Sequence, residues 1–67
     1  MIKNNLSKIM GERRLKIVDI INETPLSRGA VTRVYNDTAV KIDMSTIDEL
    51  CKFLKVDVGE LFEYIDD

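Results

Sequence analysis

The sequence of 67 residues contains no histidine, no tryptophan and a single cysteine, Cys51. One cysteine cannot form an internal disulfide, and without histidine a zinc site would have to rely on carboxylates. We therefore expect no metal and no cofactor. Without histidine a cysteine nucleophile would also lack its base; moreover, Cys51 lies on an apolar helical stripe, and the chain has no glycine-rich phosphate loop. The composition thus argues against an enzyme.

Proline, glycine and long apolar runs are also scarce. One proline and three glycines argue against a turn-rich β-sandwich. No apolar run approaches the roughly 20 residues of a membrane helix. The start of the chain, Met1 to Asn5, lacks the apolar stretch of a secretory signal. We expect a cytoplasmic protein without a membrane partner, and one domain over residues 1–67, because the chain is too short for a second core.

Positive and negative charges are unevenly distributed along the chain. Residues 1–41 hold eight Lys or Arg and four Asp or Glu, a net charge of +4, whereas residues 42–67 hold two and eight, a net charge of −6. The two values sum to the net charge of −2 of the whole chain. A surface that faces an anion, backed by an acidic surface, produces such an asymmetry; scattered solvated charge also produces it.

Apolar periodicity predicts an all-α fold of five short helices. The second helix ends at Thr24-Pro25, because a residue that precedes proline disfavours the helical conformation. A loop over about 36–44 separates the third helix from the fourth, since this segment has no helical period. The predicted helices run from about Leu6 to Arg13 with Asn4 or Asn5 as cap, from Lys16 to Glu23, from Ser27 to Tyr35, from the cap Ser45 to Leu54, and from the cap Asp57 to Ile65.

The last two predicted helices carry the clearest patterns. Ser45 with Asp48, and Asp57 with Glu60, have the spacing of a capping box, in which side chains satisfy free N–H groups at a helix start. Apolar residues then recur at i, i+3, i+4 and i+7 in each helix. They are Ile47, Leu50, Cys51 and Leu54 in the fourth helix, and Val58, Leu61, Phe62 and Ile65 in the fifth.

The helix from Ser27 to Tyr35 has an apolar side and a polar side. Val31 and Val34 lie three residues apart on one side, and Ser27 supplies a hydroxyl to the free N–H groups of the first turn. Gly29 costs about 1 kcal/mol relative to alanine inside a helix. It either allows a close approach to a ligand or accommodates a neighbouring helix. The polar face comprises Arg28, Gly29, Thr32, Arg33 and Asn36.

The stretch Leu-Ser-Arg-Gly-Ala-Val-Thr-Arg-Val-Tyr-Asn, from Leu26 to Asn36, resembles the recognition helix of the helix-turn-helix domain of the phage lambda repressor and Cro type, the Xre family. The runs from Ile47 to Val56 and from Leu61 to Tyr64 are similar to the closing helices of small bacterial and phage regulators. The resemblance covers about residues 6–65. It implies a five-helix, lambda-repressor-like fold, with helices 2 and 3 as the helix-turn-helix, and a sequence-specific transcriptional regulator that binds double-stranded DNA.

A helix about 10–12 Å across fits the major groove of DNA, where every base pair has its own donor and acceptor pattern. Arg28 and Arg33 can each present a two-pronged donor to guanine or to a phosphate. The resemblance favours Arg28 as the base-reading residue, because the family makes base contacts in the first helical turn. It implies phosphate contacts for Asn36, Lys16 and Lys41, and for the two lysines a solvated side chain is the alternative. The predicted DNA-binding residues are Lys16, Ser27, Arg28, Gly29, Thr32, Arg33, Asn36 and Lys41, with Ser27 and Thr32 as weaker donors.

One small helix reads few bases, so we expect a homodimer on a two-fold operator, with the apolar stripe of the fifth helix as the dimer patch. Three residues depart from the family pattern: Ile17 replaces a polar residue, Pro25 a turn glycine, and Asp37 adds a negative charge near the expected phosphate path. The overall acidity, Ile17 and Asp37 support an alternative, a protein-interaction module of the same fold. Such a module would bind another regulator, antirepressor- or antitoxin-like, through the acidic C-terminal half. Tyr35 and Tyr64 are interpreted as core packing or subunit contacts.

Overall fold

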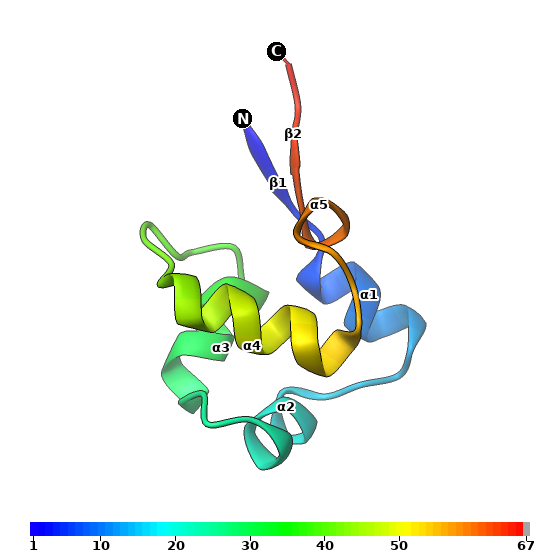
Figure 1. The fold of residues 1–67 in the computed structure, drawn as a ribbon, viewed down its shortest axis with the longest axis vertical. Coiled ribbons are helices and arrows are strands. Elements are labelled where there is room, and N and C mark those ends of the chain that lie inside the picture. Colours follow the sequence, from blue (N-terminus) through cyan, green and yellow to red (C-terminus); the bar gives the residue numbers. More distant parts are fainter. Residues whose placement is uncertain (67) are drawn as a thin grey trace.

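The computed structural model describes residues 1–66, and within them the chain forms five helices and two short strands (Figure 1). The predicted helical class is therefore confirmed. No helix in these residues is long and apolar enough to cross a membrane. The elements are β1 (Ile2–Asn4), α1 (Leu6–Glu12), α2 (Ile17–Glu23), α3 (Arg28–Tyr35), α4 (Met44–Leu54), α5 (Val58–Leu61) and β2 (Phe62–Tyr64).

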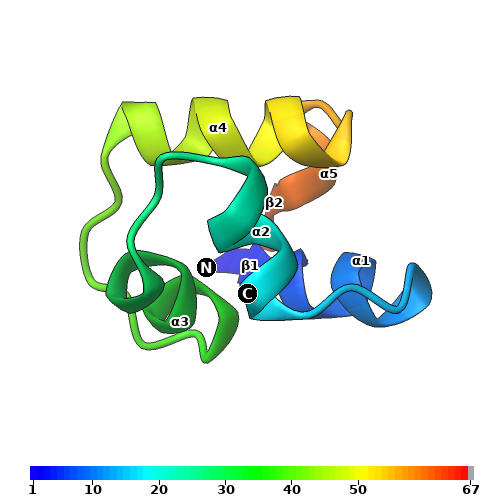
Figure 2. The same ribbon diagram turned by 90° about the horizontal axis from the view of Figure 1, so that it is seen from below.

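The helices pack around a small apolar core. Seen from below, α4 lies along one side of the molecule, and α1 and α3 lie along the other (Figure 2). Each helix contributes only one or two buried apolar side chains, so the orientation of α3 depends on all of its neighbours. The buried apolar residues are Leu6, Met10, Ile20, Val31, Val34, Leu50, Leu54 and Leu61.

The main departure from the sequence prediction is a two-stranded antiparallel ribbon that joins the two ends of the chain. We call residues 1–4 and 62–65 the β-ribbon; Ile2 lies opposite Tyr64 at its centre. The predicted fifth helix ends at Leu61 instead of residue 65, and Leu61 of its apolar stripe is buried in the core, whereas Val58 and Ile65 are exposed. The alternating residues from 62 to 65 fit a strand as well as a helix. Residues 62–64 form a strand because β1, at the other end of the chain, pairs with them, and the local sequence pattern does not contain this information.

The starts of α4 and α5 follow the capping predictions only in part. α4 begins at Met44, with Asp43 at its N-cap position, so the predicted cap at Ser45 is wrong. A carboxylate beside a helix start is favourable because of the helix dipole. At α5 the N–H of Asp57 donates to Glu60 Oε1 at 3.0 Å, as the predicted capping box requires. The segment before α4 is the predicted loop.

Two asparagines fasten the β-ribbon to the helices. Asn4 Oδ1 accepts the N–H of Leu6 at 2.9 Å, so of the two predicted caps of α1 it is Asn4 that acts. Asn4 Nδ2 also donates to the carbonyl of Val34 in α3 at 2.5 Å. Asn5 is buried, and its Nδ2 donates to Glu63 Oε1 at 2.7 Å. The base of the β-ribbon is thereby tied to the C-terminal part of α3.

Candidate nucleic-acid interface

α3 turns its apolar side to the core and its polar side outward. Val31 and Val34 are buried. The helix starts as predicted, because Ser27 occupies the N-cap position and its Oγ accepts the N–H of Ala30 at 3.1 Å. The outward side carries the exposed residues Arg28, Gly29, Arg33 and Asn36, with Thr32 half-buried between them.

Gly29 lies beneath the guanidinium group of Arg33. A methyl group added at Gly29 would meet Arg33 Nη1 at 3.3 Å and no atom of another helix within 4 Å. A neighbouring helix therefore does not explain the glycine. Because Gly29 has no side chain, the Arg33 side chain can lie close along the helix, and no bulky group projects from α3 at position 29.

The predicted lysines lie on either side of α3. Lys16, at the N-cap position of α2, lines a shallow depression together with Arg28. Lys41, in the loop before α4, lines a second depression together with Arg33. All four side chains belong to exposed residues. We call Lys16, Arg28, Arg33 and Lys41 the cationic surface.

The four cations of this surface form no ion pair within residues 1–66, although Asp43 lines the same depression as Arg33 and Lys41. Within residues 1–66 the ion pairs lie on α4, where Lys52 Nζ is 3.7 Å from Asp48 Oδ2 and 3.5 Å from Glu49 Oε1. Cations without such partners can contact phosphate oxygens without first breaking an ion pair. The cationic surface therefore has the charge and the exposure that contact with a polyanion requires.

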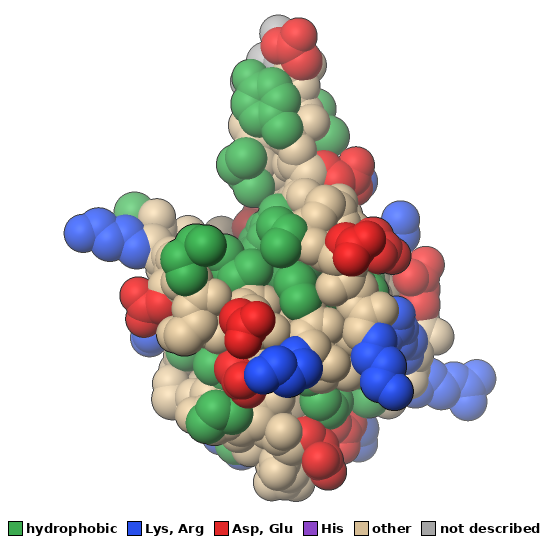
Figure 3. Space-filling view, viewed as in Figure 1, with side chains coloured by type: hydrophobic (Ala, Val, Ile, Leu, Met, Phe, Trp, Pro, Cys, Tyr) green, Lys and Arg blue, Asp and Glu red, His purple; other side chains and the backbone are tan. Residues whose placement is uncertain are grey.

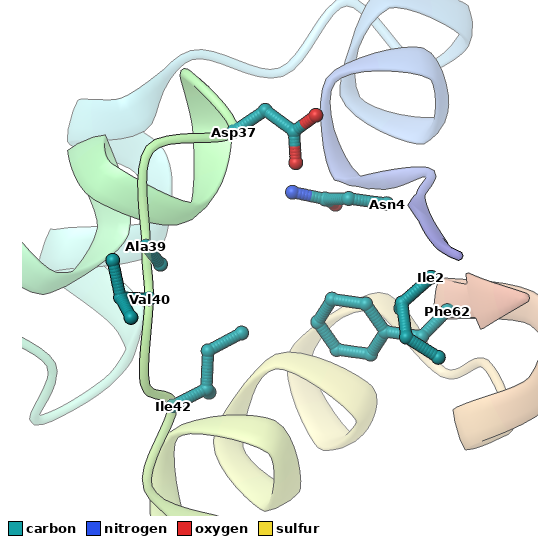
Figure 4. A pocket seen from close by; sticks show the side chains of 7 residues that line it. All are labelled: Ile2, Asn4, Asp37, Ala39, Val40, Ile42 and Phe62. Carbon is teal, nitrogen blue, oxygen red and sulfur yellow. The ribbon is translucent and has the colours of Figure 1, made fainter.

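The C-terminal end of α3 borders a groove between the loop and the β-ribbon. The N–H of Asn36 donates to the carbonyl of Thr32 at 2.9 Å, and Asp37 follows with a φ of 60°, a left-handed conformation. The Asp37 side chain points into the groove, toward Asn4 (Figure 4). Its negative charge is thus directed toward the β-ribbon.

Two residues that are not among the predicted DNA-binding residues form hydrogen bonds to the helices. Asn4 holds the carbonyl of Val34, and this contact joins residues 30 positions apart, so no local pattern predicts it. The guanidinium group of Arg13 donates to the carbonyl of Leu54 and so caps the end of α4. Arg13 therefore serves the fold.

A short outward-facing helix that carries cations and packs on a second short helix is typical of small helical DNA-binding domains. The chain belongs to the family of Cro/C1-type HTH DNA-binding domains, whose family model matches residues 5–67. This match confirms the resemblance to the lambda repressor and Cro type, and the family is non-enzymatic. Comparisons with curated proteins and with solved structures gave no significant match.

Proposed function

We propose that the chain is a sequence-specific transcriptional regulator that places α3 in the major groove, with α2 and α3 as its helix-turn-helix. The observation that carries this proposal is the cationic surface, in which two arginines on the outer side of α3 lie between two flanking lysines. A helix about 10–12 Å across enters the major groove, which is about 12 Å wide. Val31 and Val34 hold the other side of α3 in the core, so the outer side faces the bases.

Within this surface we assign base reading to Arg28. It lies in the first turn of α3, and a bidentate contact to guanine is worth about 1–3 kcal/mol of discrimination. Arg33 contacts a base or clamps a phosphate, and Gly29 lets the helix backbone approach the groove. Ser27 and Thr32 are weaker donors, and Lys16, Asn36 and Lys41 hold phosphates and fix the register of the protein on the duplex.

The regulator acts as a homodimer. A helix of eight residues reads too few bases to select one site among the many of a genome. Two copies related by a two-fold axis double the number of bases and bind half-sites one helical turn apart, about 34–36 Å. The expected operator is therefore a two-fold symmetric sequence.

Selection from random duplexes with the purified chain tests the proposal. Enrichment of a two-fold symmetric sequence is expected, with an affinity that falls steeply with salt, by about 0.9 in logarithmic slope for each neutralised phosphate. The Lys41→Ala variant should lower that slope by about 1, whereas Lys52→Ala on α4 should leave it unchanged. A failure to enrich any sequence over repeated rounds would overturn the proposal.

The acidity of the C-terminal half supports a second candidate function. Residues 42–66 contain seven Asp or Glu and two Lys, and most of these residues are exposed. An interaction module of the same fold would bind a basic regulator through this half. A stable complex with such a partner, together with no enrichment of DNA, would favour this function over the first.

A further inference from the structure

The β-ribbon exposes apolar side chains that no helix covers. It projects from the body along the long axis of the molecule (Figure 1). Ile2 is 62% exposed and Tyr64 is 72% exposed, and their direct opposition places both side chains on one face of the β-ribbon. Figure 3 shows hydrophobic side chains along this projection and on the body directly beneath it. An apolar surface that continues from a ribbon onto the body indicates an interaction site.

The outer edges of the β-ribbon carry backbone groups that its own ladder does not use. The N-terminal ammonium group of Met1 donates to the carbonyl of Ile65, and the N–H of Ile65 donates to the carbonyl of Met1, each at 2.7 Å. Hydrogen-bonded and non-hydrogen-bonded pairs alternate in an antiparallel ladder. The next pair, Ile2 with Tyr64, therefore directs its N–H and C=O groups outward. An open edge with apolar side chains is a template for a further strand.

We infer that β2 pairs with β2 of a second copy about a two-fold axis at Tyr64, so that two β-ribbons form one four-stranded sheet. This inference rests on the proposed homodimeric regulator and names its interface. Identical strands that pair side by side about a two-fold axis are antiparallel, as the geometry of such a sheet requires. The outward N–H and C=O of Tyr64 then form two hydrogen bonds with the same groups of the second copy.

The charge of Glu63 selects this register. With the axis at Glu63, two carboxylates would lie directly opposite each other, which is destabilising. With the axis at Tyr64, Glu63 faces Ile65 of the second copy and the two tyrosine rings become neighbours. Pairing through β1 is less favourable, because an axis at Lys3 opposes two ammonium groups and an axis at Ile2 leaves both tyrosines on the outer edges.

This interface is small. A standard interface takes about 800 Å² from each partner, about one sixth of the 4815 Å² surface of the chain. One edge and one face of the β-ribbon supply less than this area. We therefore expect a dimer with a Kd in the micromolar range, which DNA stabilises by holding two copies on adjacent half-sites.

Disulfide trapping tests the register. In a Cys51→Ala background, Tyr64→Cys places two thiols on a hydrogen-bonded pair with Cα atoms about 5.5 Å apart, within the range that a disulfide spans. Ile2→Cys is the matched control on the same face, and its copies would be three strand spacings apart, about 14 Å. We expect mild oxidation to yield a covalent dimer of Tyr64→Cys only. Equal trapping of both variants, or of Ile2→Cys alone, would overturn the inference.

Sedimentation of the full chain over a range of concentrations tests the interface itself. Tyr64→Lys should raise the dimer Kd by about tenfold or more, because it opposes two like charges and removes an aromatic pair. Met44→Lys makes the same charge change at a residue 80% exposed at the start of α4 and should not change the Kd. Circular dichroism of both variants checks that they fold. A native chain that stays monomeric, or an equal effect of the two variants, contradicts the inference.

The two proposals fail separately. If the chain enriches an operator but sediments as a monomer and Tyr64→Cys is not trapped, the interface is wrong and the DNA-binding function stands. If Tyr64→Cys is trapped but no sequence is enriched, the interface stands and the proposed regulator is wrong.

Discussion

The two charged regions of this chain use their charges for different purposes. The cationic surface has no carboxylate partner within residues 1–66. In the acidic half, residues 42–66, carboxylates stabilise the fold. Glu60 accepts a hydrogen bond from the N–H of Asp57, and Glu63 accepts one from Nδ2 of Asn5. A net charge of −2 conceals this division. The distribution of charge, more than its sum, therefore indicates what a small domain binds.

The two regions nevertheless share one core, and the largest predicted effect comes from removing part of it. Leu50 lies in α4 of the acidic half, is fully buried, and belongs to the same cluster as Val31 and Val34 of α3. We expect Leu50→Ala to lower the free energy of unfolding by about 2–5 kcal/mol. Urea unfolding followed by circular dichroism measures this change. The exposed Met44→Ala on the same helix is the control, with a change within about 0.5 kcal/mol.

If the regions were independent, Leu50→Ala would unfold one and leave the other. A single cooperative transition, with loss of DNA binding at the same urea concentration, is expected for one core. Two separate transitions would show that the two regions are independent folding units and not two faces of one domain.

The second prediction compares a free cation with a paired one. Arg28→Ala should weaken binding to the selected duplex by about tenfold to a hundredfold, within the 1–3 kcal/mol of a bidentate base contact. Lys52→Ala removes the same charge from the acidic half, where Lys52 already contacts Asp48 and Glu49, and should leave the affinity nearly unchanged. Fluorescence anisotropy at a fixed salt concentration measures both. An equal loss in both variants would mean that net charge, and not the placement of Arg28, governs binding.

Sequence patterns predicted the region around α3 better than the β-ribbon. The cap at Ser27 and the inward side of α3 follow from contacts within one or two helical turns, which local spacing reveals. The end of α5 at Leu61 and the contact from Asn4 to Val34 depend on segments far apart in the chain. Single-sequence periodicity does not carry that information, and a pattern that suits both helix and strand is then decided by its partner.

The third prediction concerns the contact between Asn4 and Val34, which joins the β-ribbon to α3. Asn4→Ala leaves the carbonyl of Val34 without its side-chain donor and removes the cap of α1 at Leu6. We expect a loss of about 1–2 kcal/mol in the free energy of unfolding and a smaller loss of DNA affinity than Arg28→Ala causes. Lys3→Ala, an exposed neighbour in the same strand, is the control and should change neither quantity by more than about 0.5 kcal/mol. Unchanged stability in Asn4→Ala would show that the β-ribbon does not hold α3.

The smallest predicted effect is a difference in thiol reactivity between the acidic half and the cationic surface. Burial raises the pKa of the Cys51 thiol, and the carboxylates of Asp48, Asp57 and Glu60 raise it further. A raised pKa leaves less thiolate near pH 8, and the thiolate is the reactive form, so Cys51 should react slowly with iodoacetamide. A thiol introduced by Thr32→Cys in a Cys51→Ala background is half-buried like Cys51 but lies between Arg28 and Arg33, whose charges favour the thiolate.

The reaction rates of the two thiols therefore compare the electrostatic potentials of the two regions without any ligand. We expect the thiol at position 32 to react faster than Cys51 at pH 8, and the difference to shrink as salt screens the charges. Both rates should rise as the pH increases, with the rise at position 32 beginning at lower pH. A rate difference that persists unchanged at about 1 M salt, where the screening length is about 3 Å, would assign it to accessibility rather than to charge. Equal rates at low salt would mean that the fields at the two sites do not differ.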